Sequence, residues 1–443
     1  MTRSAAWVLI GLLAIGSAVG LLLGYAEAST AMYAAGGLLV VTVIAPRIAA
    51  DADRSWLPSV VIVAYLVKLI ASTARWGVLE FVYGGSGDAT GYHGAGNILV
   101  AVWRGFEVPE MAIGTTFVDA TTAFLYVPHV PTFLGGFFLF ATIAFLGQLL
   151  LYAAFRQGDR SGRLGWYAAG VFFLPTIVYW PSSIGKESLM FLFLGLASYG
   201  AAGLLKDHRL RWLTIFSVGV AGAAAVRPHV ALILVSSLAV AIIFRKRAKG
   251  EKFSIKRLVA IAATGSVLVA ATVVAAMNFG IDFSSGISTT DGIERVIGNV
   301  EKNTSGGGSG VEGGIISSPA EFPAGFVKVL FRPFPTEAGT PQVMASSMEG
   351  MLLLGLLLWR LIPILKNLRH IRSHPYVLYA FVFTIGFVIA FSSFNNIGLL
   401  ARQRSQVMPF LLVVVITLGW SLPADTDESP AVAKSPPAPA VRS

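Results

Sequence analysis

Residues 133–155 read FLGGFFLFATIAFLGQLLLYAAF and contain no charged side chain. A helix that crosses a bilayer needs about 20 consecutive, mainly apolar residues, because the hydrocarbon core is about 30 Å thick. A helix also satisfies its own backbone hydrogen bonds where no water is present. This stretch therefore predicts a membrane-spanning α-helix, and similar apolar blocks recur on both sides of it along the chain.

The composition of the whole chain agrees with a membrane protein. Of the 443 residues, 55% are hydrophobic and 13% are charged, and the mean hydropathy is +0.73. Soluble proteins carry about 25% charged residues. These values exclude a soluble enzyme, a disordered protein and a nucleic-acid-binding domain, so no nucleic-acid partner is expected. The absence of cysteine excludes disulfides, zinc–thiolate sites and a cysteine nucleophile.

The apolar blocks predict an all-α polytopic membrane protein with about twelve transmembrane helices in a single domain, residues 1–421. The predicted spans lie near residues 5–24, 30–46, 56–80, 133–155, 164–180, 188–205, 212–226, 229–244, 258–278, 348–365, 375–393 and 406–421. Residues 5–24 could instead be a signal peptide, with Ala26-Glu27-Ala28 as its cleavage site. Their apolar stretch is long for that, which favours an uncleaved first helix.

The basic residues assign a side to each loop. Cytoplasmic loops are enriched in Lys and Arg. If the N-terminus is cytoplasmic, 22 of the 33 basic residues lie in alternate loops or in the termini. Both termini are therefore predicted to be cytoplasmic, in a cell (plasma) membrane. Residues 422–443, rich in Pro, Ala and Ser, are predicted to form a disordered cytoplasmic tail.

The opposite, extracytoplasmic side is predicted to carry two long loops, about 81–132 and 279–347, and three short turns near 181–187, 227–229 and 394–405. Residues 92–106 and 322–334 contain spaced apolar side chains that suit short helices at the membrane surface. The glycine-rich residues 305–314 predict the tip of a mobile lid.

Eleven basic residues break the positive-inside pattern, namely Lys68, Arg75, Arg104, Lys186, Arg227, Arg295, Lys302, Lys328, Arg332, Arg402 and Arg404. Cations on the translocated side cost insertion free energy and often mark functional sites. A lipid phosphate or diphosphate at headgroup depth would suit them, because Arg grips such groups with two parallel hydrogen bonds. The alternative is ordinary snorkelling to lipid headgroups.

The stretch Gly87-Asp88-Ala89-Thr90-Gly91-Tyr92-His93 directly follows the third predicted span. Asp88 could act as a general base on a sugar hydroxyl, or hold a divalent cation (Mg²⁺ or Mn²⁺) against phosphate. Tyr92 and His93 share its helical face if a helix begins here. We therefore take Asp88 and His93 as catalytic candidates and Tyr92 as a substrate-binding candidate. The alternative is that Asp88 only caps the helix.

The turn Pro181–Ser188 is predicted to precede a helix whose first turn holds Lys186 and Glu187. Helix N-termini bind anions through free backbone N–H groups, and Lys186 would add a formal charge there. Glu187 is a substrate-binding candidate, although a first-turn acid also suits the helix dipole alone. The spacing of a Walker motif is absent, so this turn does not indicate ATP use.

The segment Phe331–Glu337 presents Arg332 from a backbone that two prolines restrict. Aromatic side chains flanking an arginine suit a prenyl chain with its phosphate, or the face of a sugar. We take Arg332 as a phosphate ligand and Glu337 as a substrate-binding candidate. The alternative is a proline-rich loop anchored at the interface by its phenylalanines.

Several of these motifs resemble membrane glycosyltransferases. The pattern Asp88-x-x-x-Tyr92-His93 after an early span resembles the first outer loop of enzymes with the GT-C fold, which use polyprenyl-phosphate sugars. Four other segments are similar to bacterial polysaccharide polymerases of the O-antigen polymerase type: the run from Tyr179 to Glu187, Arg227-Pro228, Phe331-Arg332-Pro333 and Arg402-x-Arg404. The chain departs from the pattern by having more than one span before the acidic loop, and no second acid beside Asp88.

The resemblance implies that a sugar is transferred from a polyprenyl-(di)phosphate donor to a saccharide or lipid-linked acceptor on the extracytoplasmic side, in cell-surface polysaccharide and cell-wall synthesis. Asp88 would deprotonate or orient the acceptor hydroxyl. The (di)phosphate leaving group would be held by Lys186, Arg227, Arg332, Arg402 and Arg404. The expected partners are the lipid-linked donor, the saccharide acceptor and membrane lipids.

Two other functions fit the same topology. A transporter or flippase of lipid-linked saccharides would also have about twelve spans, and it predicts broken helices at mid-membrane. A scaffold subunit of a wall-synthesis complex predicts that none of the unusual charges affects turnover.

Overall fold

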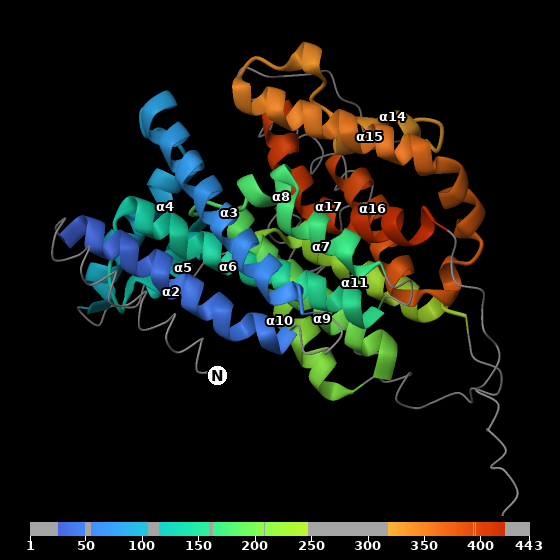
Figure 1. Cartoon of the computed structure of the whole chain (residues 1–443), viewed down its shortest axis with the longest axis horizontal. Coiled ribbons are helices and arrows are strands. Elements are labelled where there is room, and N and C mark those ends of the chain that lie inside the picture. The colour runs from blue at the N-terminus through green and yellow to red at the C-terminus, as the bar shows by residue number, and fades with distance from the viewer. Residues whose placement is uncertain are drawn as a thin grey trace, which may run out of the picture.

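The computed structural model of the chain describes residues 25–48, 55–104, 115–158, 163–207, 209–246, 318–392, 394 and 396–420. Throughout these residues the secondary structure is helical and no strand is formed, as the sequence predicts. The helices in chain order (Figure 1) are α2 (Tyr25–Ile48), α3 (Leu57–Gly77, continued by the π-helical η1, Val78–Val82), α4 (Asp88–Arg104), α5 (Thr115–Tyr126), α6 (Phe133–Gly158), α7 (Leu164–Phe173), α8 (Pro175–Tyr179), α9 (Lys186–Asp207), α10 (Leu210–Val226), α11 (Pro228–Phe244), α14 (Phe322–Phe331), η3 (Pro335–Glu337), α15 (Pro341–Leu368), η4 (Ile371–Ser373), α16 (Pro375–Phe391) and α17 (Ile397–Leu418).

Six helices in the described part are long and apolar enough to cross a membrane: Ala26–Arg47, Leu57–Val82, Phe133–Gly158, Lys186–Asp207, Pro341–Leu368 and Gly398–Leu418. Each overlaps a predicted span, so the prediction of an all-α polytopic membrane protein is confirmed. Twelve spans remain a prediction. The predicted spans 5–24 and 258–278, the lid tip 305–314 and the tail 422–443 lie outside the described residues.

Several predicted spans are shorter helices than expected. Helices α10, α11 and α16 have 17 residues each, which corresponds to about 26 Å at 1.5 Å per residue. The span predicted at 164–180 is not continuous, since α7 ends at Phe173, Leu174 is extended (φ −63°, ψ 122°) and α8 begins at Pro175. Proline disfavours a helical conformation in the residue before it and supplies no N–H. The break lets the short α8 lead into the buried turn before α9.

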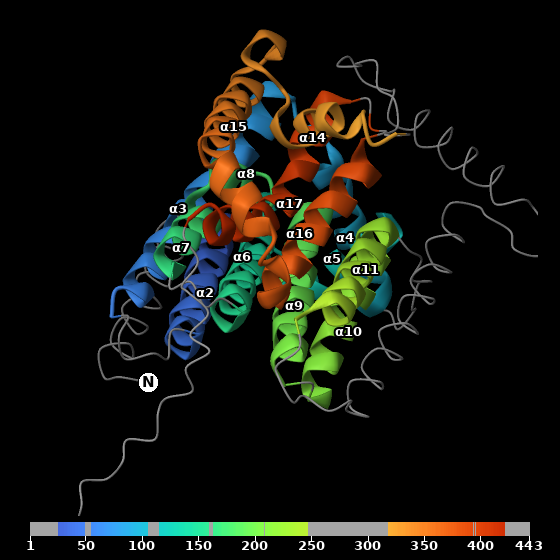
Figure 2. The same cartoon turned by 90° about the vertical axis from the view of Figure 1, so that its right-hand side faces the viewer.

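The closest packing lies between α6, α9 and α10. A Cβ added at Gly147 of α6 would lie 2.1 Å from the carbonyl oxygen of Phe191, and one at Gly219 of α10 would lie 2.4 Å from the amide nitrogen of Ala197. Helices in lipid associate through such close packing of small residues, because lipid tails are as apolar as the side chains. In Figure 2, α15 lies along the edge of the bundle, where Leu352 is 76% exposed.

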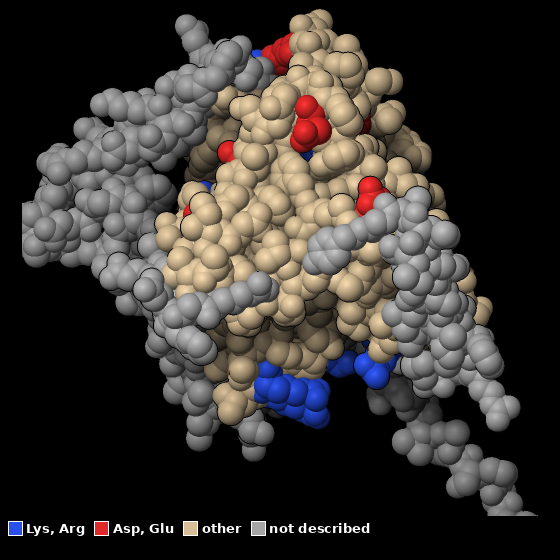
Figure 3. All heavy atoms as spheres, turned by 90° about the vertical axis from the view of Figure 1, so that its left-hand side faces the viewer, with Lys and Arg blue, Asp and Glu red and all other residues tan. Residues whose placement is uncertain are grey.

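The predicted cytoplasmic loops meet at one end of the bundle. Nε of Arg372 donates to the carbonyl of Phe244 at the end of α11, at 2.8 Å, and Nη1 of Arg245 donates to the carbonyl of Leu205 near the end of α9, at 3.4 Å. On the face in Figure 3, basic side chains gather at the lower end and acidic ones lie higher. Helices α9 and α11 both begin at the opposite end, with Lys186 and Pro228, where the predicted outer turns lie.

Candidate functional site

Four charged residues from four predicted outer segments form one ion-paired cluster. Arg402, in the second turn of α17, donates from Nη1 and Nη2 to Oδ2 of Asp88 at the start of α4, at 3.2 Å each. Its Nη2 also donates to Oε2 of Glu187, in the first turn of α9, at 3.1 Å. The other oxygen of Glu187 accepts from Nη2 of Arg227, between α10 and α11, at 2.9 Å. Residues up to 314 positions apart therefore meet at one point.

Burial differs sharply across this cluster. The side chain of Glu187 is 2% exposed and that of Arg227 is 10% exposed, whereas Arg402 is 26% and Asp88 is 62% exposed. Glu187 lies at a helix N-terminus, where the helix dipole favours a negative charge, and two guanidinium groups compensate for its removal from water. Glu187 is thus the fixed anchor of the cluster, and Asp88 is the acid that faces solvent.

The residues near Glu187 and Arg227 in the chain explain the backbone conformations that bring these two side chains together. Gly185, directly before α9, has φ +146°, a conformation that side chains other than hydrogen rarely allow. A Cβ at this position would also lie 3.3 Å from the ring of Tyr92. Arg227 is extended (φ −147°, ψ 90°), as expected for a residue before proline. Both positions need backbone geometries that Gly185 and the Arg227-Pro228 pair supply.

A cavity of about 280 Å³ opens beside the cluster, and Asp88, Arg402 and Arg75 line it together with Tyr179 and Trp180. The guanidinium carbon of Arg75 lies 5.5 Å from the ring centre of Tyr179 and 5.0 Å from that of Trp180, within range of cation–π attraction. Its Nη1 is buried and has no hydrogen-bond partner among the described residues. The wall of the cavity therefore includes a guanidinium group, that of Arg75, whose hydrogen-bonding capacity is not fully used.

The charges around the cavity do not balance. Four cations and two acids interact electrostatically here: Arg75, Lys186, Arg227 and Arg402 against Asp88 and Glu187. Of these six residues, Arg75, Arg402 and Asp88 line the cavity, which gives its wall a net charge of +1. An excess of positive charge beside a cavity favours binding of an anion, and guanidinium groups suit phosphate oxygens in particular. The sequence singled out Arg75 as an unusual cation but did not assign it to the site, because nothing in the local pattern places the end of the third span beside Trp180.

A row of polar residues on α3 holds the segment that carries Tyr179 and Trp180. Nζ of Lys68 donates to the carbonyls of Ile177 and Val178, at 3.1 Å each, and Oγ of Ser72 donates to the carbonyl of Ser182 at 3.0 Å. Positions 68, 72 and 75 lie on one face of a helix. The carbonyls they bind come from the end of α8 and the turn after it, where no further helical N–H satisfies them.

Two other predicted residues lie beside the cluster. Nζ of Lys186 donates to Oγ1 of Thr115 in α5 at 3.0 Å. The side chain of Tyr92 is buried against Gly185, and burial raises the pKa of Tyr92 to about 12. Its hydroxyl therefore stays protonated at neutral pH. Tyr92 packs against the backbone that presents Glu187, but it is not among the residues that line the cavity.

His93 of α4 is not among the residues that line the cavity. Its Nδ1 lies 2.9 Å from the hydroxyl of Tyr126, and its Nε2 lies 3.3 Å from Nδ2 of Asn97. Burial lowers the pKa of His93, so the neutral imidazole is favoured. Because both ring nitrogens already have partners, a catalytic role for His93 would require these contacts to break.

The structure places Arg404 and Arg332 apart from the cluster. Arg404 is 0% exposed, and its Nη2 donates to Oγ1 of Thr176 and to the carbonyl and hydroxyl of Ser346 at 2.8–3.2 Å. Residues two apart on a helix do not share a face, which explains why Arg404 does not follow Arg402. Arg332 is ion-paired with Glu337, and this contact lowers the pKa of Glu337.

Mg²⁺ and Mn²⁺ bind mainly to clusters of oxygen ligands such as carboxylates. In the described part of the chain, no group of three or more His, Asp or Glu side chains could hold a metal ion. Asp88 and Glu187 are both paired with Arg402. These residues do not form a divalent-cation site of the oxygen-rich kind that such ions prefer.

The fold and the site together define an α-helical integral membrane protein with a cationic cavity among its helix ends. No protein-family model, curated protein or solved structure matches the chain.

Proposed function

We propose that the chain is a membrane-embedded glycosyltransferase or polymerase that uses a polyprenyl-(di)phosphate-linked sugar as its donor. The observation that carries the proposal is the convergence of four outer segments, through Asp88, Glu187, Arg227 and Arg402, on one ion-paired cluster beside a cavity with an excess of positive charge. A lipid-linked phosphate is an anion that a membrane protein can take up from the bilayer. A solvent-facing acid beside it is what an acceptor hydroxyl requires.

In the proposed reaction, the hydroxyl oxygen of the acceptor attacks C1 of the donor sugar. The bond between C1 and the phosphate oxygen breaks, and the phosphate leaves with the electron pair. Asp88 takes the proton of the attacking hydroxyl. Arg402 lines the cavity and would stabilise the negative charge that develops on the leaving phosphate. Arg227 would support Arg402 through their shared partner Glu187. The energy comes from the phosphate–sugar bond, so no nucleotide is needed.

The pairing of Asp88 with Arg402 suits a resting state. The two charges are 62% and 26% exposed, and exposed ion pairs contribute only about 0–1 kcal/mol. A donor phosphate could therefore displace Asp88 from Arg402 at little cost and free the carboxylate to act as a base. Arg402 would keep its contact with the buried Glu187 and hold its position.

The test is activity in proteoliposomes that contain extracted lipid-linked saccharides. We expect wild-type protein to form new glycosidic bonds, and Asp88→Asn and Arg402→Ala to lose this activity while staying folded. Asp207→Asn is the matched control, because this acid pairs with Arg209 at the other end of α9. Unchanged activity in both site variants would refute the assignment of the site.

A flippase of lipid-linked saccharides is the second candidate. The break between α7 and α8 at Leu174 and the buried Lys68 beside it favour this function, because transporters use broken helices and intramembrane charges. Movement of the lipid-linked saccharide across the bilayer without a new glycosidic bond would favour the flippase.

A further inference from the structure

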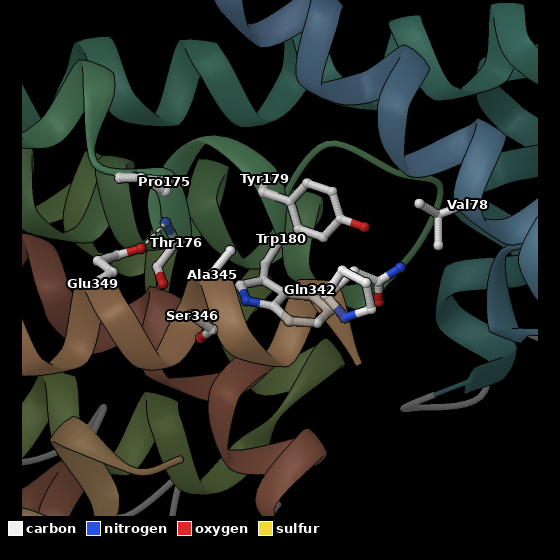
Figure 4. Close-up of a pocket in the computed structure, with 10 residues that line it drawn as sticks. Val78, Pro175, Thr176, Tyr179, Trp180, Gln342, Ala345, Ser346 and Glu349 are labelled. Atoms are coloured by element: carbon white, nitrogen blue, oxygen red, sulfur yellow. Dashed lines mark hydrogen bonds between the residues drawn. The ribbon is translucent and has the colours of Figure 1, made fainter. Parts of the chain in front are cut away.

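A second cavity, of about 330 Å³, lies between the segment of α8 and the first turns of α15. Its lining includes Val78, Pro175, Tyr179, Trp180 and Ala345. Figure 4 shows side chains of the α8 segment and of α15 facing each other across it. No Lys or Arg is among the residues that line this cavity, whereas Arg75 and Arg402 line the first one.

Three polar residues at the edge of this second cavity, Thr176, Ser346 and Glu349, form hydrogen bonds with protein groups. The amide of Thr176 donates to Oε2 of Glu349 at 2.7 Å, and Arg404 donates to the hydroxyls of Thr176 and Ser346 at 3.2 and 2.8 Å. Oε1 of Glu349 is buried and has no hydrogen-bond partner among the described residues. The surface that lines the cavity is nevertheless mainly apolar. An apolar chain would fit it better than a sugar.

The two cavities adjoin. Both are lined by Val78, Tyr179, Trp180 and Gln342. The aromatic pair Tyr179 and Trp180 thus borders both the cationic and the apolar cavity, and Arg75 lies against both rings. A single ligand that occupied both spaces would need an anionic head and an apolar tail.

The second cavity also lies where membrane lipid can reach it. Val78 is near the end of the candidate span Leu57–Val82, and Ala345 is near the start of Pro341–Leu368. Large apolar side chains beside these positions are open to the surroundings, since Phe81 is 77% and Met348 is 60% exposed. Exposed apolar surface on a spanning helix faces lipid, so a chain could enter sideways from the bilayer.

We propose that the two cavities form one site for a lipid-linked phosphate, with the phosphate between Arg75 and Arg402 and the first part of the lipid chain between α8 and α15. The inference rests on the proposed function and adds to it the path of the chain and a further phosphate ligand, Arg75. The phosphate would bind the guanidinium group of Arg75, which lines the cavity and whose buried Nη1 has no hydrogen-bond partner among the described residues.

The phosphate and the lipid chain contribute differently to binding from a bilayer. A chain that moves from lipid into an apolar cavity gains little hydrophobic free energy, because lipid tails are equally apolar. Affinity therefore comes from the phosphate, and the cavity matters because it lets the chain follow its headgroup. Filling the cavity should exclude a lipid-linked phosphate and leave a free phosphate unaffected.

The experiment measures binding to the full-length protein in nanodiscs with two probes, undecaprenyl phosphate by native mass spectrometry and inorganic diphosphate by calorimetry. Ala345→Trp fills the second cavity. Gly355→Trp, on the same helix at a position with nothing within 4 Å of its Cβ, is the matched control. Arg75→Ala removes the proposed phosphate ligand, and intrinsic fluorescence checks that each variant is folded.

We expect Ala345→Trp to weaken undecaprenyl phosphate binding by about tenfold or more while diphosphate binding and the Gly355→Trp control stay unchanged. Arg75→Ala should weaken binding of both probes. Unchanged undecaprenyl phosphate binding in Ala345→Trp, or equal competition by phosphatidylglycerol, would overturn the inference. If Arg75→Ala does not fold, the Ala345→Trp comparison still decides.

This outcome can be separated from that of the proposed function. If Ala345→Trp weakens undecaprenyl phosphate binding but the wild-type protein forms no new glycosidic bond in proteoliposomes, the binding site is supported and the transferase function is refuted. Glycosyl transfer that is insensitive to Ala345→Trp would support the transferase and refute the path of the chain.

Discussion

Replacing Glu187 with glutamine tests whether the ion-paired cluster holds the outer helix ends together. Its two oxygens accept from Arg227 at 2.9 Å and from Arg402 at 3.1 Å, and its side chain is 2% exposed. Removing one partner of a buried ion pair costs about 3–5 kcal/mol, because the remaining charge is left uncompensated. Arg402 keeps Asp88, whereas no other ion pair of Arg227 is found among the described residues. We therefore expect Glu187→Gln to lower the free energy of unfolding by about 3 kcal/mol, the lower end of this range.

The free energy of unfolding would be measured by titrating the purified protein from mild detergent into sodium dodecyl sulfate and following its intrinsic fluorescence. Glu80→Gln is the matched control, since Glu80 is exposed near the end of α3 and surface substitutions change stability by about 0.5 kcal/mol or less. A double-mutant cycle with Arg227→Ala should show strong non-additivity. If the free energy of unfolding of Glu187→Gln lies within about 0.5 kcal/mol of the wild-type value, Glu187 does not anchor the cluster.

Three further predictions address other residues. Asp88→Asn should lower glycosyl transfer in proteoliposomes about 100-fold or more with unchanged unfolding, because its ion pair is exposed; intact activity would remove Asp88 as the base. Arg404→Ala should destabilise the protein by about 3 kcal/mol, since it leaves buried partners on α8 and α15 unsatisfied; normal unfolding with lost undecaprenyl phosphate binding would instead place Arg404 in the site. The ion pair with Arg332 lowers the folded-state pKa of Glu337, so its stabilisation is complete above the unfolded pKa of about 4.3 and is lost as pH falls through the lower folded value. Glu337→Gln should therefore weaken the fall in stability between about pH 5 and 3, and an unchanged acid profile would contradict this.

The sequence predicted the helical class and the approximate position of each described spanning helix, because these depend on local composition. A run of about 20 apolar residues needs no tertiary information to be read as a span. Boundaries were less accurate, and α17 begins at Ile397 instead of near residue 406. Polar residues in its first turns, including Gln403 and Arg404, hid this start in the sequence, and both are buried among other helices.

The sequence by itself determined that the chain is a membrane protein and that unusual cations and Asp88 lie at helix ends. Only the tertiary structure decided which of them meet. Arg402 joins Asp88 and Glu187, whereas Arg404, two residues later, bonds to Thr176 and Ser346. The physical reason is that a helix turns about 100° per residue, so the packing of α17 against its neighbours, and not the residue type, selects which side chain faces the cavity.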